Sequence, residues 1–365
     1  MFKLTVIRFG FLLGILCVNQ NIQAQQPWLP RDPSPAASVS QTVGISKITV
    51  DYSRPSVRGR EVWGQLVPYG WNVQGFGLGN RAPWRAGANE NTVLHLSHDA
   101  TVQGVKVPAG DYGLSFVINK DNSGEVIVSK DYKSWGSFFY DSTRDQLRAN
   151  ITVRDIPNFV ERLEYSFDSV SKNMAELDLN WAKKQFPVKI EFEVEKIVME
   201  NTRELLKGQT SFAWQNFNAA ANYSLANKVE LEQGLKWANN AIANQPAPSF
   251  APVITKAGIL DLMGNHTESE KIMKDAMAKA TETEINNYGY FLLGNNQFDK
   301  AIEAFKVNTQ NHPASANAWD SLGEAYALAG DKKNAIANFK KSLSMNPPAN
   351  VKANSEKYLK QLGAM

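Results

Sequence analysis

The sequence predicts an α+β chain of two domains, an antiparallel β-sandwich-like domain followed by an α-helical repeat solenoid. Short runs that alternate apolar and polar residues occupy positions 36–195, as half-buried strands do. Helical spacing, rich in Ala, Asn, Lys and Leu, replaces that pattern after residue 196. Residues there recur at a fixed separation of 34 positions, which indicates stacked helical units rather than an arbitrary bundle.

The first 24 residues have the pattern of a secretory signal peptide. Lys3 and Arg8 give a positive start, residues 9–18 form an apolar run, and Ala24 ends a suitable cleavage site. The apolar run is shorter than the roughly 20 residues that a membrane-spanning helix needs. We therefore expect an exported protein, periplasmic or secreted, with no transmembrane segment in the mature chain.

Charge and cysteine content narrow the function classes. The formal net charge is +3, and two of these charges, Lys3 and Arg8, belong to the predicted signal peptide. With no basic footprint left, we expect no nucleic-acid partner. Cleavage after Ala24 also removes Cys17, the single cysteine, and with it disulfides and thiolate metal sites. The alternative, a lipid anchor on Cys17, requires a small residue before it, and Leu16 stands there.

Residues 33–195 are predicted to form a β-rich domain of about eight short strands. Turn-forming Pro, Gly, Asn and Asp residues separate them, which favours an antiparallel sandwich or barrel. The predicted strands are 39–45, 48–52, 92–96, 112–118, 126–128, 151–153, 175–181 and 188–194. The connection 64–88, rich in Gly, Trp and Pro, is too long for a hairpin, so we expect a binding loop or a flap over the sheet.

The helical part is predicted to contain a linker helix at 196–211, repeats at 212–348 and a capping helix at 349–365. The period is carried by pairs of identical residues: Gly289 and Gly323, Ala301 and Ala335, Phe305 and Phe339, Pro313 and Pro347. Small residues let two helices approach closely, and Phe339 is expected to fill the gap to the next unit. Two earlier units fit less well, so about four stack in all.

Arginine and tryptophan in the β part point to a ligand site. Arginine forks bind carboxylates or phosphates, and tryptophan faces stack on sugar rings or cations. The residues concerned follow a predicted strand or close the long connection: Arg54, Arg58, Arg60, Trp84 and Arg85. The alternative is structural, because these arginines could pair with Glu61, Glu90 and neighbouring acids to brace the loop.

Catalytic chemistry finds little support. Asp141, Asp145 and Glu90 could supply a carboxylate pair for glycoside hydrolysis, but acids beside a turn are more often turn formers and arginine partners. The G-x-G-x-G spacing at 75–79 does not precede a helix, so it lacks the context of a dinucleotide site. We predict a non-enzymatic protein with no catalytic residues, no metal site and no cofactor.

The β part resembles a family of secreted bacterial domains, domain of unknown function 2911 (DUF2911). The resemblance rests on Tyr52-Ser53-Arg54-Pro55, Gly59-Arg60, Leu66-Val67-Pro68-Tyr69-Gly70, Trp84-Arg85-Ala86-Gly87-Ala88-Asn89-Glu90 and Val107-Pro108-Ala109-Gly110-Asp111-Tyr112-Gly113. It implies a secreted β-rich domain with no established activity. It also implies one constellation, structural or ligand-binding, of Arg54, Arg60, Trp84, Arg85, Asn89 and Glu90.

The helical part resembles tetratricopeptide repeats (TPR), through the recurring residues above together with Trp319, Leu322 and Tyr326. The resemblance implies a protein or peptide partner held in a concave groove lined by the first helix of each unit. Carried over, the groove residues are Asn286, Tyr290, Asp320 and Glu324. The family's best-known groove clamps a peptide carboxylate with basic residues, and the two acids would repel such a carboxylate.

Two functions follow as expectations. The leading one is an exported non-enzymatic protein whose repeats mediate protein–protein interaction and whose β domain is a docking or binding module of unknown ligand. The alternative is a periplasmic glycan- or anion-binding protein, or one that acts on glycans, with its site in the 64–90 loop.

Overall fold

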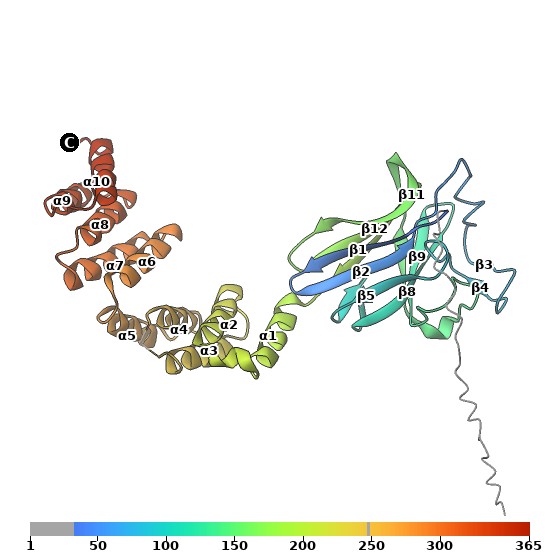
Figure 1. The fold of residues 1–365 in the computed structure, drawn as a ribbon, viewed down its shortest axis with the longest axis horizontal. Helices are drawn as coiled ribbons and strands as arrows, with labels where there is room; N and C mark the ends of the chain where they lie inside the picture. The colour runs from blue at the N-terminus through green and yellow to red at the C-terminus, as the bar shows by residue number, and fades with distance from the viewer. Residues whose placement is uncertain (1–32, 247–248) are drawn as a thin grey trace, which may run out of the picture.

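The structure is a computed structural model that describes residues 33–246 and 249–365. The predicted signal peptide and its cleavage site lie outside the described residues. In the described chain a β domain comes first and ten α-helices follow, extending away from the sheets (Figure 1). The predicted fold class is confirmed: an antiparallel β domain precedes a helical repeat array.

The described β domain contains two large antiparallel sheets and one small one. The six-stranded sheet has the order β1-β2-β5-β8-β9-β10, with β1 Ala36–Val43, β2 Ser46–Ser53, β5 Thr92–Leu96, β8 Gly110–Ile118, β9 Ser123–Ser129 and β10 Asp145–Thr152. The four-stranded sheet has the order β11-β12-β6-β7, with β11 Arg154–Val170, β12 Met174–Glu191, β6 Ala100–Val102 and β7 Val105–Val107. The small sheet is a hairpin of β3 Asn72–Val73 and β4 Arg81–Ala82.

The two large sheets share one hydrophobic core, which makes the domain sandwich-like. Strand β2 shows how the sequence builds it, because Ile48, Val50 and Tyr52 are buried while the residues between them face outward. Phe116 of β8 and Trp181 of β12 are among the largest fully buried side chains. The alternating pattern in the sequence therefore marks the inner face of each sheet.

The first hairpin turns earlier than predicted. The alternation predicted a strand over 39–45, but β1 ends at Val43 and residues 44–45 form the turn. Gly44 has a φ of +60°, and a Cβ there would lie 2.4 Å from Cγ1 of Val194. Glycine at this position both adopts the left-handed conformation and admits Val194, so the strand ends before it.

The end of the β domain also differs from prediction. Instead of two strands at 175–181 and 188–194, the structure has one 18-residue strand, β12, paired with β11. Ala182, at φ +51°, pairs with Val160 where the register between the two strands shifts. Strand β11 was missed because it lies at a sheet edge and most of its side chains are exposed, so its sequence carries little alternation.

The helices form consecutive pairs. Their bounds are α1 Val194–Leu205, α2 Trp214–Asn227, α3 Leu231–Ala243, α4 Ala251–Leu262, α5 His266–Met277, α6 Glu282–Gly294, α7 Phe298–Asn311, α8 Ala316–Leu328, α9 Lys332–Leu343 and α10 Ala349–Gln361. Helix α1 begins shortly after β12, at Val194, before the start of the linker helix predicted at 196–211. Four pairs, α2 with α3 to α8 with α9, follow it, and α10 packs on α8 and α9.

The position of Phe339 refines the packing expected for it. Its ring lies against Gly323 within its own helix pair, where a Cβ would be 2.9 Å from the ring. It also stacks on Tyr358 of α10, with ring centroids 5.1 Å apart and an interplanar angle of 13°. The aromatic residue therefore fills space within its own unit as well as the gap to the next helix. Across the described residues, no helix combines the length and apolarity needed to cross a membrane.

Candidate functional site

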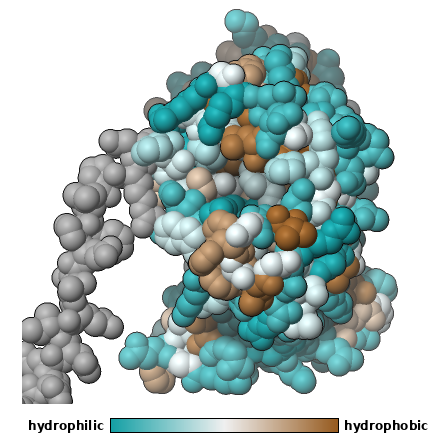
Figure 2. Space-filling model, turned by 90° about the vertical axis from the view of Figure 1, so that its right-hand side faces the viewer, coloured by the Kyte–Doolittle hydropathy of each residue, from teal (hydrophilic) through white to brown (hydrophobic). Residues whose placement is uncertain are grey.

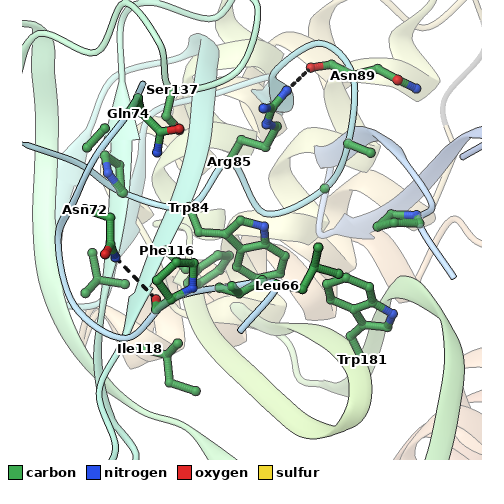
Figure 3. A pocket seen from close by; sticks show the side chains of 18 of the residues that line it. Leu66, Asn72, Gln74, Trp84, Arg85, Asn89, Phe116, Ile118, Ser137 and Trp181 are labelled. Carbon is green, nitrogen blue, oxygen red and sulfur yellow. Dashed lines mark hydrogen bonds between the residues drawn. The ribbon is translucent and has the colours of Figure 1, made fainter. Parts of the chain in front are cut away.

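A cavity of about 620 Å³ lies where the long connection 64–88 folds back against the β domain. Residues of that connection and of the segment 55–60 form much of its wall, and Phe116 and Ile118 of β8 and Trp181 of β12 complete it. Figure 3 shows its two sides: the labelled polar side chains Gln74, Ser137, Arg85 and Asn89 lie above, and Trp84, Phe116, Leu66 and Trp181 lie below. The long connection therefore forms part of a pocket wall.

Trp84 is held in place at the centre of the aromatic side. Its backbone N–H donates to the Phe116 carbonyl at 2.8 Å, and the Phe116 N–H donates back to the Trp84 carbonyl at 2.9 Å. Its indole stacks on that of Trp181, with centroids 5.9 Å apart and an angle of 13°, and meets Trp63 edge to face at 5.6 Å. This packing fixes a half-buried indole in the cavity wall.

Arg85 lies beside Trp84 on the polar side. Its Nη1 donates to the carbonyl of Asn89 at 2.6 Å, and its guanidinium lies 5.2 Å from the Phe138 ring centroid. Burial lowers the pKa of Arg85. Asn89 itself is left-handed, at φ +63°, and its Nδ2 donates to Ser34 O and Ser53 Oγ, each at 3.3 Å. The turn 85–89 therefore holds the guanidinium in place without a carboxylate.

Arg58 and Arg60 line the cavity from its other edge. Arg60 donates to two backbone carbonyls, from Nε to Val57 at 3.0 Å and from Nη2 to Ser56 at 2.6 Å. The backbone of Arg58 donates to Oε1 of Glu161 at 3.0 Å, while its guanidinium has no ion pair or hydrogen bond to any described residue. Both side chains are exposed cations at the rim.

The structure separates two residues from the predicted constellation. Arg54 is absent from the cavity wall: its Nε donates to Leu163 O at 2.9 Å and its Nη2 pairs with Glu164 Oε2 at 3.1 Å. It braces the end of β2 against β11, a structural role whose partner is Glu164 and neither Glu61 nor Glu90. Glu90 is exposed, also lies off the cavity wall, and has an interaction partner of its own. Arg60, Trp84, Arg85 and Asn89 remain together at the cavity.

The wall residues that were not singled out from the sequence include Gln74, Phe116 and Ser137. Gln74 lies within the loop already suspected, but nothing in its neighbours distinguishes it. In the sequence, Phe116 has the pattern of an ordinary core residue of a strand. Ser137 comes from a separate loop about fifty positions after Arg85, so only the folded chain brings them together. Its Oγ is buried and has no hydrogen-bond partner in the described chain.

The β3–β4 hairpin closes one side of the cavity, and Val73, Gln74 and Gly75 belong to its wall. Its tip is fastened at Gly77, which has a φ of +85° and whose Cβ would lie 1.9 Å from the Phe138 carbonyl oxygen. The next residue donates from Leu78 N to that same oxygen at 3.0 Å. Of the three glycines in the G-x-G-x-G spacing, only Gly77 is required by a close backbone approach, because a Cβ at Gly75 or Gly79 would meet nothing within 4 Å.

Large apolar side chains of the same hairpin are exposed: Val73, Phe76 and Leu78. The face of the molecule on the β-domain side shows apolar side chains gathered among hydrophilic ones (Figure 2). Phe76 also meets Phe138 and Phe139 edge to face, at 5.7 and 5.9 Å. These contacts tie the hairpin to the segment that carries Ser137.

The acids considered for glycoside hydrolysis have structural partners. Asp141 caps a short 3₁₀ helix, with Oδ1 accepting from Thr143 N at 2.9 Å and Thr143 Oγ1 at 2.8 Å. Asp145 accepts from Tyr140 OH at 2.6 Å and Arg148 Nε at 2.5 Å. Neither acid lines the 620 Å³ cavity. Their contacts are those of a turn former and an arginine partner.

Three of the predicted groove residues form one hydrogen-bonded network. Glu324 of α8 accepts from Tyr290 OH of α6 at 3.1 Å, and from Tyr358 OH at 3.0 Å and Asn354 Nδ2 at 3.2 Å of α10. Asp320 accepts from Asn354 Nδ2 at 2.8 Å and from the Ser355 hydroxyl. Burial raises the pKa of Asp320, and the pKa of Tyr358 is raised to about 12, mainly by burial.

This network limits which of the predicted groove residues are accessible to a partner. Asp320 is only 4 % exposed, so its carboxylate serves the contact between α8 and α10. Asn286 of α6 does not join the network: its Oδ1 is buried and has no partner in the described residues. Tyr290 stays 37 % exposed. Of the four predicted groove residues, Tyr290 offers the most surface to a partner.

Comparison with known proteins agrees with both resemblances. Residues 34–190 match the family described as "Protein of unknown function (DUF2911)", and residues 316–348 match the family described as "Tetratricopeptide repeat". Among curated proteins, none matches this sequence.

Solved structures of tetratricopeptide-repeat proteins are similar to part of the chain. "YrrB: a TPR protein with an unusual peptide-binding site" has 14 % identity, covers 45 % of this chain and 84 % of its own, and gives a TM-score of 0.26. MamA has 15 % identity, with 42 % and 89 % covered and a TM-score of 0.26. PilF of Pseudomonas aeruginosa has 18 % identity, with 42 % and 71 % covered and a TM-score of 0.26. Likeness at this level carries no argument about function.

Proposed function

Because a DUF2911 domain precedes tetratricopeptide repeats in this chain, we propose that it is an exported, non-enzymatic binding protein. Its β domain holds a small ligand in the 620 Å³ cavity, and its repeats hold a protein partner. Tetratricopeptide repeats are protein-interaction modules. The ligand site, the export and the absence of catalysis are further parts of what we propose.

The cavity carries the ligand part of the proposal. Its volume falls within the roughly 300–1,000 Å³ that small-molecule sites occupy. An aromatic wall around Trp84 faces a polar wall that contains Arg85 and Ser137, which is the usual composition of a site that orients its ligand (Figure 3). These groups are suited to hold a ligand rather than to transfer protons, which supports a binding role.

The distribution of apolar side chains supports a partner on the array. Between α2 and α10, the large apolar residues that the described structure leaves exposed lie on α4, α6 and α8, the first helices of their pairs: Leu262, Tyr290, Phe291 and Leu328. Phe291 is the most exposed of them, at 60 %. Exposed aromatic residues are enriched at protein interfaces, so these helices are the side on which we place the partner.

A thermal-shift screen tests the ligand site. The mature chain, residues 25–365, is heated with neutral sugars, acidic sugars, amino acids and small dicarboxylates, and a ligand is expected to raise its Tm. The control variant is Gly75→Trp, because a Cβ on this wall residue meets nothing within 4 Å and the indole can occupy the cavity. A shift that persists in this variant, or no shift with any compound, would count against the proposal.

The remaining parts have separate tests. For the partner, a pull-down from an envelope fraction compares the wild-type chain with Phe291→Ala, and the captured protein should be lost from the variant.

For export, mass spectrometry of the protein purified from its native cells should find an N-terminus at Gln25. An intact N-terminus in the cytoplasmic fraction would contradict it.

A further inference from the structure

We infer that the cavity of the β domain takes an acidic sugar, a single sugar ring or a pair of rings that bears a carboxylate or phosphate. This inference rests on the proposed function, since it names the ligand class of that same site. Three properties of the wall lead to it: positive charge without an acid to balance it, polar groups that lack partners, and an aromatic face.

The wall of the cavity carries positive charge. Arg58, Arg60 and Arg85 line the cavity, and its described wall contains neither Asp nor Glu. Elsewhere in the described chain, arginines are typically paired with carboxylates, and the pairs are Arg54–Glu164, Arg144–Asp131, Arg148–Asp145, Arg154–Glu176 and Arg203–Glu230. The guanidinium groups of the three cavity arginines have no carboxylate partner among the described residues. Those of Arg60 and Arg85 donate to carbonyls, and only the backbone N–H of Arg58 meets an acid, Glu161. A bound anion would supply the missing countercharge.

Polar groups without partners favour a ligand rich in hydroxyls. The Ser137 Oγ is buried and has no hydrogen-bond partner in the described chain. The Gln74 amide on the hairpin makes no hydrogen bond to any described residue. Buried polar groups are nearly always paired, so an unpaired serine in a cavity wall indicates a group that a ligand satisfies. A sugar presents several hydroxyls at the spacing of such separate partners.

The aromatic side of the cavity indicates a ligand that contains a sugar ring. The half-buried Trp84 offers the aromatic surface of the wall opposite Ser137 and Arg85, and the buried Trp181, on which it stacks, and Phe116 support it (Figure 3). A sugar ring has an apolar face of C–H groups and a polar edge, and it matches a cavity with one aromatic and one polar side. A fatty acid would leave the polar groups unpaired, and a bare anion such as phosphate would leave the indole unused.

Isothermal titration with the mature chain, residues 25–365, tests the inference. The probes are D-glucuronate, D-glucose 6-phosphate, D-glucose and inorganic phosphate, at 20 and 200 mM NaCl. At least one acidic sugar should bind tenfold or more tightly than both glucose and phosphate. Its affinity should fall at the higher salt, because the rim arginines are exposed and their attraction is screened.

Matched variants locate the site. Arg58→Gln removes a guanidinium that has no partner among the described residues, so the fold should hold while the acidic sugar binds at least tenfold more weakly. Ser137→Ala should weaken both acidic and neutral sugars. Arg162→Gln removes an exposed arginine of β11 that does not line the cavity, and it should leave binding unchanged.

The outcomes distinguish this inference from the proposed function. Glucose binding as tightly as the acidic sugars, with Ser137→Ala weakening both, overturns the acidic ligand and leaves the ligand site standing. Acidic-sugar binding that is equally weakened by Arg58→Gln and Arg162→Gln reflects general charge and overturns the inference. If none of the four probes binds, the inference is overturned as well. The ligand site then fails only if the wider thermal-shift screen also finds nothing.

Discussion

Gly289 of α6 and Phe305 of α7 lie so close that a Cβ on the glycine would sit 2.4 Å from the ring carbon Cζ. The same arrangement returns 34 residues later, where a Cβ on Gly323 would lie 2.9 Å from Cδ1 of Phe339. In each pair the glycine lets the ring approach the backbone of the neighbouring helix. The period seen in the sequence is therefore a packing period, set by an aromatic ring and the space left for it.

We predict that Gly289→Ala destabilises the array by about 1–3 kcal/mol, the range seen when a methyl group is forced into a packed core. Gly294→Ala, on the same helix, is the matched control, because a Cβ there meets nothing within 4 Å. It should be neutral or stabilise by up to about 1 kcal/mol, since alanine favours the helix more than glycine does. Urea unfolding followed by circular dichroism at 222 nm measures both, and equal effects would contradict the packing argument.

A second prediction concerns Glu324, which accepts hydrogen bonds from Tyr290, Asn354 and Tyr358. Glu324→Ala leaves the Tyr358 hydroxyl without its acceptor and takes one of two acceptors from Tyr290 and from Asn354, so it should destabilise the array by about 1–3 kcal/mol and loosen α10. Hydrogen–deuterium exchange over 349–361 should then be faster. Glu356→Ala breaks only the exposed contact with Lys352, at 3.8 Å, and should leave that exchange unchanged. Protection of α10 that survives Glu324→Ala would show that its other contacts, the stacking of Tyr358 on Phe339 and the hydrogen bonds to Asp320, hold it without Glu324.

The sequence predicts best what depends on neighbours along the chain. The array is readable because Gly289 and Phe305 belong to consecutive helices and their constraint recurs at one period. The inner strands are readable because a buried face leaves alternation, as in β2. Strand β11 is not, because an edge strand tolerates exposed and irregular residues, Pro157 among them.

Only part of the candidate site could be predicted from the sequence, for the same reason. Trp84, Arg85 and Asn89 share one tight turn, and the motif around them is local. Ser137 reaches the cavity because Gly136 precedes it and packs on Arg85, where a Cβ would lie 2.5 Å from Cζ. Arg54 carries the same side chain as Arg58 four positions away, yet only the fold decides that one meets Glu164 and the other meets the cavity.

The hairpin over the cavity gives a third prediction. Gly77→Ala places a methyl group where the Phe138 carbonyl oxygen lies, so the tip should detach and the hydrogen bond from Leu78 should break. We expect faster hydrogen exchange over 72–82 and weaker ligand binding, while the Tm of the domain changes little because the hairpin lies outside the core. Gly104→Ala is the control for backbone strain, with φ +80° in another turn and open space at its Cβ. Unchanged exchange in Gly77→Ala would mean that Phe76 alone anchors the tip.

The last prediction concerns Asp178 of β12, a carboxyl group that is only 1 % exposed and whose Oδ1 has no partner in the described residues. Its pKa is raised to about 7, first by burial and then by the charges of Glu176 and Asp168, while Arg154 acts against them. In the unfolded chain the pKa of an aspartate is about 3.9, so between about pH 4 and pH 7 the folded protein binds the extra proton. The contribution of Asp178 to the free energy of unfolding is therefore largest below pH 4, is lost as the pH rises to 7, and is constant above it.

Asp178→Asn replaces the carboxyl group with an amide that stays neutral, so the variant should gain stability over the wild type as the pH rises. We expect the difference in the free energy of unfolding, from urea titrations followed by tryptophan fluorescence, to increase from pH 4.5 to 7 and then level off. Asp168→Asn removes an exposed neighbouring charge and should produce the same trend at a much smaller size. A difference that does not vary with pH would mean that the carboxyl group titrates alike in the folded and unfolded chain, and that its burial is compensated by water.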